Sequence, residues 1–500
     1  MTGFSNLINA FIGLMDLTTI CLLLASTALG CIIGALPGLT ATMGIALLSG
    51  LTFGLPINYS LAVLLGIYVG GIYGGSISAI LLNIPGTASA AATAIDGHQL
   101  ALQGQAETAI RATRLASVIG TFLGVCALAF VAPQLTKVAL KFQSADLFML
   151  ALFGVMICGS IGTEDMVVKG WIGGLIGLLI AMFRIDDIEG VARFTFGNNN
   201  LLSGISVIPA MIGFYAVPEV IKAFAEPSDA KVMDMKDSGG KKINVAKLVF
   251  SKLRIVISCA LMGIGIGALP GVGEDVAAWV SYDVTRKTSK EKQKFGKGSY
   301  EGVIAPEVGN NAAIGGALIP MLCLAVPGSA PAAVLLGALN LNGIRPGPMI
   351  GIESPGFIEQ VAALLFLSVV ALWIVGMLIA KPMVRILRIP KLYLMPVVMV
   401  LSVIGAYAIN LSRFDLTLVF IFGVAGYFLN KMKYSPAPIV LGIILGQMVD
   451  FRFRNALRVV NGNASTFVTR PISLIFFCLI LITIAFQIYV NAKRAKGKDK

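Results

Sequence analysis

The sequence predicts an all-α polytopic membrane protein, with two inverted-topology repeats that contain broken or re-entrant helices and a further C-terminal transmembrane helix. Of the 500 residues, 57% are hydrophobic and 13% are charged, and the mean hydropathy is +0.88. Soluble domains are about 45–50% apolar and about 25% charged. Apolar runs long enough to cross a bilayer recur along the chain. The string Gly-Ala-Leu-Pro-Gly occurs inside two of them, at 34–38 and 267–271.

The apolar runs form two corresponding series, each of which opens with two proline-interrupted segments. The first series is 17–56 (broken at Pro37), 60–95 (broken at Pro85), 112–132, 147–161, 170–183 and 201–217. The second is 254–282 (broken at Pro270), 309–341 (broken at Pro327), 357–380, 393–410, 415–430 and 437–449, and a last helix lies at 472–491. The chain therefore divides into a first membrane repeat (1–225), a basic cytoplasmic linker (226–253), a second membrane repeat (254–460) and a C-terminal transmembrane helix with a basic tail (461–500).

The second broken segments of the two halves also correspond. Pro85-Gly86-Thr87 in the first half aligns with Pro327-Gly328-Ser329 in the second, each after a run rich in Gly and Ala. A proline-glycine break frees backbone polar groups, which are tolerated at membrane depth only where protein or a wet cavity satisfies them. Matched breaks therefore indicate an internal duplication and a binding site to which both halves contribute.

Basic residues between the segments predict the orientation through the positive-inside rule. The stretches expected on the cytoplasmic side are 231–254, 286–297, 381–391, 431–433 and 493–498, together with Arg111 and Arg114. Counting membrane crossings between these stretches gives the two halves opposite orientations and places the C-terminus on the cytoplasmic side. It allows the first broken segment of each half to be either a re-entrant hairpin or two short passes. One cluster, formed by Arg452, Arg454 and Arg458, falls on the wrong side.

Inverted repeats with broken helices are typical of secondary transporters, including elevator-like ones, in which we expect the broken segments to move against a scaffold of uninterrupted helices. A half-helix that begins after a break points N–H groups and a positive dipole end outward, so we expect an anionic or polar substrate. In the alternative interpretation, small residues at the breaks only allow close helix packing. The expected substrate-binding residues are Gly38, Thr40, Thr42, Gly86, Thr87, Ser89, Gly271, Gly273, Gly328 and Ser329.

Polar residues in the second half suggest an ion-coupling site that includes Asp275, Asn310 and Asn311. Carboxylate, amide and unwound carbonyl oxygens are ligands that alkali cations prefer, so the coupling ion is expected to be Na⁺ or a proton. Two alternatives remain open, because Asp275 could lie at the cytoplasmic edge and the two asparagines could form a polar contact between helices. We expect no other metal and no cofactor.

Several function classes are disfavoured. The net charge of +13 does not indicate nucleic-acid binding, because the basic residues lie in short blocks between apolar segments. The single histidine, His98, lies in a polar stretch where a solvated loop is expected, and the seven cysteines are scattered without ligand-like spacing. There is no His-Glu-x-x-His motif and no Walker A loop, so we expect neither catalytic residues nor a primary pump. A passive channel could share the broken helices and stays an alternative.

Five motifs together resemble the TctA family, the large membrane subunit of tripartite tricarboxylate transporters. They are Gly34–Leu39, Tyr73–Ser76, Ile84–Thr87, Gly267–Gly271 and Pro306–Ala313. The resemblance covers essentially the whole chain. It implies a small membrane subunit (TctB-like) and a periplasmic substrate-binding protein (TctC-like) as partners. It also implies import of citrate or another carboxylate across the bacterial inner membrane, driven by an ion gradient, commonly sodium.

Overall fold

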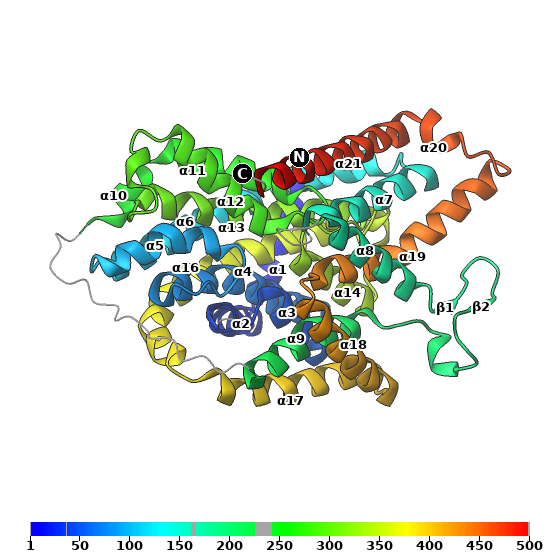
Figure 1. The fold of residues 1–500 in the computed structure, drawn as a ribbon, viewed down its shortest axis with the longest axis horizontal. Coiled ribbons are helices and arrows are strands. Elements are labelled where there is room, and N and C mark those ends of the chain that lie inside the picture. Colours follow the sequence, from blue (N-terminus) through cyan, green and yellow to red (C-terminus); the bar gives the residue numbers. More distant parts are fainter. Residues whose placement is uncertain (1, 37, 162–166, 226–242, 499–500) are drawn as a thin grey trace.

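The computed structural model describes residues 2–36, 38–161, 167–225 and 243–498, and these residues are mainly helical (Figure 1). Pro37 and residues 226–242 of the expected linker lie outside the described residues. The first half comprises α1 (Thr2–Leu14), α2 (Leu17–Ala35), α3 (Ala41–Thr52), α4 (Ile57–Leu82), α5 (Ala90–Leu102), α6 (Ala106–Ala139), α7 (Ser144–Ile161), α8 (Val167–Ala181), the two-stranded antiparallel hairpin β1 (Arg184–Ile185) and β2 (Ala192–Arg193), η1 (Asn199–Leu201) and α9 (Val207–Ala225). The remainder comprises α10 (Val245–Phe250), α11 (Leu253–Gly267), α12 (Gly273–Thr288), η2 (Lys292–Lys294), α13 (Tyr300–Leu324), α14 (Ala330–Leu341), α15 (Ile350–Glu353), α16 (Phe357–Leu387), α17 (Lys391–Asn410), α18 (Arg413–Lys431), α19 (Pro436–Val459), α20 (Thr466–Thr469) and α21 (Pro471–Lys498).

The helices confirm the predicted polytopic membrane fold. Among the described residues, eight helices are long and apolar enough to cross a membrane. Each apolar run of the sequence corresponds to a helix, and the predicted breaks at Pro85, Pro270 and Pro327 separate α4 from α5, α11 from α12 and α13 from α14. The β1–β2 hairpin and the N-terminal helix α1 were not predicted, because α1 is too short to span a bilayer and the strands are two residues each.

Helix α2 runs beside α4 and in the same direction. Ser26 on α2 donates a hydrogen bond of 3.3 Å to the carbonyl oxygen of Ala62 on α4. Farther along both helices, a Cβ atom at Gly34 would lie only 2.0 Å from the carbonyl oxygen of Gly71. The backbones of α2 and α4 therefore touch at Gly34, which requires a residue without a side chain.

Helix α3 returns toward the start of α4, so that α2 and α3 form a helical hairpin. Its first residue, Ala41, faces Gly71 in the middle of α4, where a Cβ atom at Gly71 would lie 2.8 Å from that of Ala41. Its last residue, Thr52, accepts a hydrogen bond of 2.9 Å from Ser60 near the start of α4. Both arrangements that charge parity left open, a re-entrant hairpin and two short passes, contain such a fold-back, and the choice between them stays a prediction.

The second half repeats this arrangement in α11, α12 and α13. A Cβ atom at Gly267, the counterpart of Gly34, would lie 2.5 Å from the carbonyl oxygen of Ala313 on α13. Helix α12 packs back along α13, and a Cβ atom at Gly309 would lie 2.1 Å from Ser281 Oγ. In both halves the following long helix ends in a left-handed residue, Asn83 after α4 (φ 55°) and Ala325 after α13 (φ 59°).

The two repeats run in opposite directions, as the parity of basic residues predicts. Helices α6 and α16 hold equivalent places, since each follows the second broken segment of its half. Arg114 near the start of α6 donates to the carbonyl oxygen of Gly376 in the second half of α16 (3.4 Å). Farther along α6, Phe122 packs on Phe366 near the start of α16, with 5.7 Å between ring centroids. Equivalent helices that lie antiparallel establish the inverted repeat.

The helices pack as two groups. In the first group α2, α4, α5, α6, α11, α12, α13 and α16 contact one another, and in the second α7, α8, α9, α17, α18, α19 and α21 do so. The short helices α3 and α14 contact each other and also α9 of the second group. Of the uninterrupted helices, α6 and α16 pack directly against the broken segments of the first group, and the division into a moving part and a scaffold stays a prediction.

Some of the basic residues predicted on the cytoplasmic side, namely the loop 286–297 with Arg111, Arg114 and Lys381, lie at one end of the molecule, whereas Lys431 and Lys433 line a different pocket. Asp96 on α5 accepts hydrogen bonds from the backbone N–H groups of Gly296, Gly298 and Ser299, which binds the basic loop after α12 to α5. One pocket at this end is lined by Arg111, Arg114, Asn244 and Lys381 among others. In Figure 1 the β1–β2 hairpin and α20 lie at the opposite end from α5 and α10.

The arginine that violated the charge parity has acidic partners. Arg454 on α19 forms ion pairs with Asp186 and with Glu189 (2.7 Å) in the connection between α8 and α9. Arg193 joins the same network through Asp186 (2.6 Å) and Asp450 (2.9 Å). Acidic side chains therefore hold Arg454 in place, and the side of the membrane on which Arg452, Arg454 and Arg458 lie stays open.

Candidate functional site

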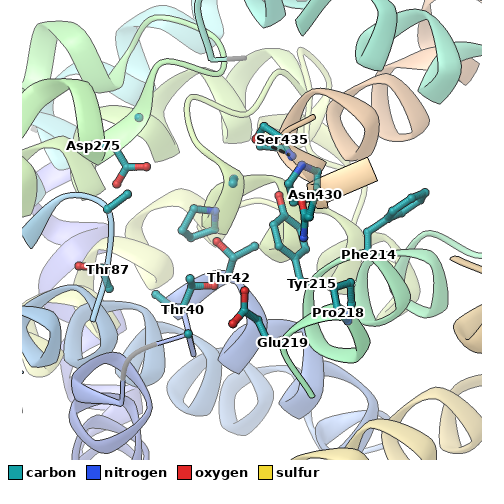
Figure 2. Close-up of a pocket in the computed structure, with 18 of the residues that line it drawn as sticks. Thr40, Thr42, Thr87, Phe214, Tyr215, Pro218, Glu219, Asp275, Asn430 and Ser435 are labelled. Atoms are coloured by element: carbon teal, nitrogen blue, oxygen red, sulfur yellow. Dashed lines mark hydrogen bonds between the residues drawn. The ribbon is translucent and has the colours of Figure 1, made fainter. Parts of the chain in front are cut away.

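A cavity of about 750 Å³ lies where the helix breaks of both repeats meet. Figure 2 shows Thr40, Thr42, Thr87 and Asp275 on one side of it, and Tyr215, Asn430 and Ser435 across from Thr87 and Asp275. The second wall comes from α9, the end of α18 and the start of α19. The cavity therefore lies at the boundary between the two helix groups, with α3 and α14 between them.

Four short helices begin at this cavity, namely α3, α5, α12 and α14. Thr40 caps α3 by accepting a hydrogen bond from Met43 N (3.2 Å), and Ser329 caps α14 by accepting from Ala332 N (3.3 Å). Helices α5 and α12 have no side-chain cap. Their positive dipole ends, which lack a side-chain cap, make this part of the cavity favourable for an anion.

The structure brings together residues from all four predicted breaks. Seven of the predicted site residues line the cavity, namely Gly38, Thr40, Thr42, Thr87, Gly271, Gly273 and Asp275. Four others, Gly86, Ser89, Gly328 and Ser329, are buried next to it without lining it. Asn310 and Asn311 do not line it, and both are fully buried within α13. The three residues assigned to ion coupling therefore do not share one site.

Ser329 is already engaged in a contact between repeats. Its Oγ lies 2.8 Å from the hydroxyl of Tyr68 on α4, and this hydroxyl also donates to Glu274 on α12. The Glu274 side chain is buried. The contact joins α4, α12 and α14, and the role of Ser329 in binding substrate stays a prediction. Tyr68 was missed because a tyrosine inside an apolar run gives no local signal of such a partner.

Asp275 occupies the first turn of α12, and its side chain is exposed to the cavity. Its carboxylate accepts a hydrogen bond from the backbone N–H of Ser89 at the start of α5. The two uncapped N-termini thus meet across the repeats, with a carboxylate between them. A negative group at a helix N-terminus is electrostatically favourable, and here the protein supplies one itself.

Glu219 and three lysines line the wall formed by the second helix group. Gly38 has a φ of +96°, which favours glycine, and a Cβ atom there would lie 2.6 Å from a carboxylate oxygen of Glu219. Lys222, Lys431 and Lys433 are exposed and supply positive charge to the cavity. Sequence reasoning used the basic residues only for sidedness and missed Glu219, because α9 is distant in the chain from every break.

Comparison with known proteins identifies a family. The model of the tripartite tricarboxylate transporter TctA family matches residues 20–441. The chain is 35% identical over 474 residues to an uncharacterized 52.8 kDa protein in the TAR-I ttuC′ 3′ region of Agrobacterium vitis, which covers 94% of this chain and 93% of that protein. An uncharacterized protein in the TAR-II ttuC′ 3′ region of the same organism is 35% identical over 231 residues, 46% of this chain and 96% of its own length. No solved structure matches the chain.

Proposed function

Because the chain belongs to the tripartite tricarboxylate transporter TctA family, we propose that it imports a tricarboxylate or related carboxylate through the cavity at the helix breaks. An ion gradient, most simply of Na⁺, supplies the energy. A small TctB-like membrane subunit and a periplasmic TctC-like binding protein are the proposed partners, and the latter delivers the substrate.

The observation that carries this proposal is the convergence of four half-helix N-termini on one cavity. A multiply charged carboxylate needs several donors and positive charge at once, and no single helix end supplies both. The N-termini of α5 and α12 supply donors, while Lys222, Lys431 and Lys433 on the facing wall supply charge. A cavity at the boundary between two helix groups is also where relative motion would expose substrate to alternate sides.

We also propose a location in the bacterial inner membrane with a cytoplasmic C-terminus. The supporting observations are that the loop 286–297, Arg111, Arg114 and Lys381 lie at the end of the molecule with α5 and α10, and that α21 runs from α20 back toward α11 and α12 (Figure 1). The division into repeats at 1–225 and 254–460, with a linker at 226–253 and a terminal helix within 461–500, is part of the same proposal.

The test is uptake by proteoliposomes that contain the protein with its small membrane subunit and its binding protein. A panel of radiolabelled di- and tricarboxylates is supplied with and without a Na⁺ gradient. Accumulation of one carboxylate above its outside concentration supports the proposal. If the carboxylate only equilibrates across the membrane and its flux does not depend on an ion gradient, the protein is a passive channel. No flux of any carboxylate would exclude the proposed role.

Substitution of the cavity lysines should weaken substrate affinity. Lys222→Gln or Lys431→Gln is expected to raise the apparent KM for the carboxylate about three- to tenfold, since each removes one exposed charge that attracts the anion. The difference from the wild type should shrink at high salt, because ions screen exposed charges. Lys137→Gln, an exposed lysine of α6 outside the cavity, is the matched control. If Lys222→Gln and Lys431→Gln have the same KM as this control, the two lysines do not contribute to substrate binding.

A further inference from the structure

A carboxylate is buried in the first helix group, away from the cavity lining. Glu307 on α13 is fully buried. Its Oε1 accepts hydrogen bonds from Ser76 on α4 (2.5 Å) and Thr93 on α5 (2.6 Å), and its Oε2 accepts one from Ser117 on α6 (2.8 Å). Four helices from both repeats thus direct oxygen atoms at one point.

Within the described residues, no lysine or arginine pairs with Glu307. The nearest cation along α6 is Arg114, one turn before Ser117, and its guanidinium instead contacts the carbonyl of Gly376 and the ring of Trp373. Asp96 on α5 is directed at the loop after α12. On α4 the Tyr73 hydroxyl, one turn before Ser76, is buried and has no hydrogen-bond partner among the described residues. An ionised carboxylate buried this way costs several kcal/mol unless something neutralises it.

The asparagine pair extends this cluster along α13. Asn311 donates to the carbonyl oxygen of Glu307 (2.9 Å) and to Asn310 Oδ1 (2.6 Å), and it accepts from Thr121 on α6 (3.3 Å). Asn310 Nδ2 is buried without a partner in the part of the chain that the structure describes. A buried unpaired donor is destabilising by about 1–3 kcal/mol, so this polar set is retained at a cost in stability.

The cluster has no counterpart in the other repeat. Under the alignment that pairs Pro85 with Pro327, the position of Glu307 corresponds to Leu65. Those of Ser76 and Thr93 correspond to Leu318 and Leu335. All three leucines are fully buried. The repeat therefore packs well with apolar residues here, and packing alone does not account for the polar set.

The cluster is connected to the cavity through the second break. Thr93 lies one helical turn after Ser89, whose N–H group bonds Asp275 in the cavity wall. Ser76 follows Gly75, where a Cβ atom would lie 2.3 Å from Thr87 Oγ1. The groups that hold Glu307 thus flank Thr87 on both sides along the chain.

We propose that Glu307 binds the coupling ion, a monovalent cation of the Na⁺ or proton class, at a site distinct from the substrate cavity. The site rests on the proposed transport function, and it replaces Asp275 as the ion-coupling carboxylate. A bound Na⁺ is held by the carboxylate with the hydroxyls of Ser76, Thr93 and Ser117, whose oxygens are hard ligands. A bound proton converts Glu307 to a neutral acid that the same hydroxyls hydrogen-bond. Either ion fixes α4 and α5 around the second break and so sets the shape of the cavity.

The first test measures binding of radioactive Na⁺ to the purified protein without substrate. For a Na⁺ site, Glu307→Gln is expected to weaken binding at least about tenfold, a loss of about 1.4 kcal/mol. Ser117→Ala, which removes one donor on α6, should weaken binding severalfold and keeps the proposal testable if Glu307→Gln does not fold. Ser368→Ala is the matched control, because this buried serine of α16 bonds only its own helix at Leu364. Its Na⁺ affinity should equal that of the wild type.

The second test separates the proton from Na⁺ through transport. If the wild type binds no Na⁺, its uptake should depend on a pH gradient, and Glu307→Gln should abolish this dependence while carboxylate counterflow persists. The proposal would be overturned if Glu307→Gln kept both the gradient dependence and the Na⁺ affinity of the wild type. If Glu307→Gln does not fold, the same result in Ser117→Ala would overturn it. Na⁺ binding that requires Glu307 in a protein that moves no carboxylate would leave the ion site standing and exclude only the proposed substrate.

Discussion

Gly328→Ala is expected to reduce carboxylate uptake at least about tenfold and to destabilise the protein by about 3 kcal/mol, the upper range for overpacking. The added Cβ atom would lie 2.0 Å from the carbonyl oxygen of Gly267 and 2.6 Å from the Cα atom of Ala317. Both are backbone atoms, so α11 or α13 must shift, and with it the start of α14 at the cavity. Uptake by proteoliposomes and the thermal unfolding temperature of the purified protein measure the two effects.

Two further variants sharpen this test. Gly86→Ala, the counterpart in the first repeat, places its Cβ atom 1.9 Å from the carbonyl oxygen of Gly34 and should behave like Gly328→Ala. Gly265→Ala is the control, because a Cβ atom at Gly265 on α11 meets nothing within 4 Å. Normal uptake in Gly328→Ala together with normal stability would show that the close approach at the breaks is not required.

Arg470→Met is expected to destabilise the protein by about 1–3 kcal/mol, because it leaves a buried carboxylate without the charged partner that reaches it from a half-buried position. Asp146 at the start of α7 is fully buried and lies 2.9 Å from Arg470 Nη2. It also accepts hydrogen bonds from Ser473 Oγ (2.6 Å) and from the backbone N–H of Gln143 (2.9 Å). Thermal unfolding of the purified protein measures the loss, and α21 should detach first because Arg470 immediately precedes it.

A double substitution tests the cause. Asp146→Asn combined with Arg470→Met removes both charges, so most of the lost stability should return. If the double variant is as unstable as the sum of the two single variants, the destabilisation comes from packing and not from an unpaired carboxylate.

The arrangement of broken segments could be predicted from sequence because its signals are local. Pro85, Pro270 and Pro327 each interrupt an apolar run, and the structure ends or begins a helix beside each of them. Blocks of Lys and Arg gave the opposite orientations of the two halves, which α6 and α16 confirm. The distribution of basic residues shows on which side of the membrane a segment ends, but not how deeply it enters. The hairpins of α2–α3 and α11–α12 could therefore be recognised only from their contacts with α4 and α13.

The candidate site was harder to predict because its partners are distant in the chain. Glu307 stood in a recognised motif, yet its ligands Ser76, Thr93 and Ser117 come from three other helices. Glu219 faces Gly38 from α9, which no spacing within the first break indicates. A small hydroxyl at a break can cap a helix or bind substrate, and sequence cannot separate these roles. Ser329, predicted to bind substrate, caps α14 and contacts Tyr68 in the structure.

The polar cluster around Glu307 has leucines at its symmetry-related place, and this bears on the resting state of the protein. Two identical inverted repeats would exchange roles between the inward-facing and outward-facing forms, which would then have equal energy and equal populations. A carboxylate site present in only one repeat removes that equality. Occupancy of this site therefore gives the two forms different free energies, even where the ion and substrate concentrations are equal on the two sides of the membrane. The protein thus has an intrinsic preference for either the inward-facing or the outward-facing form.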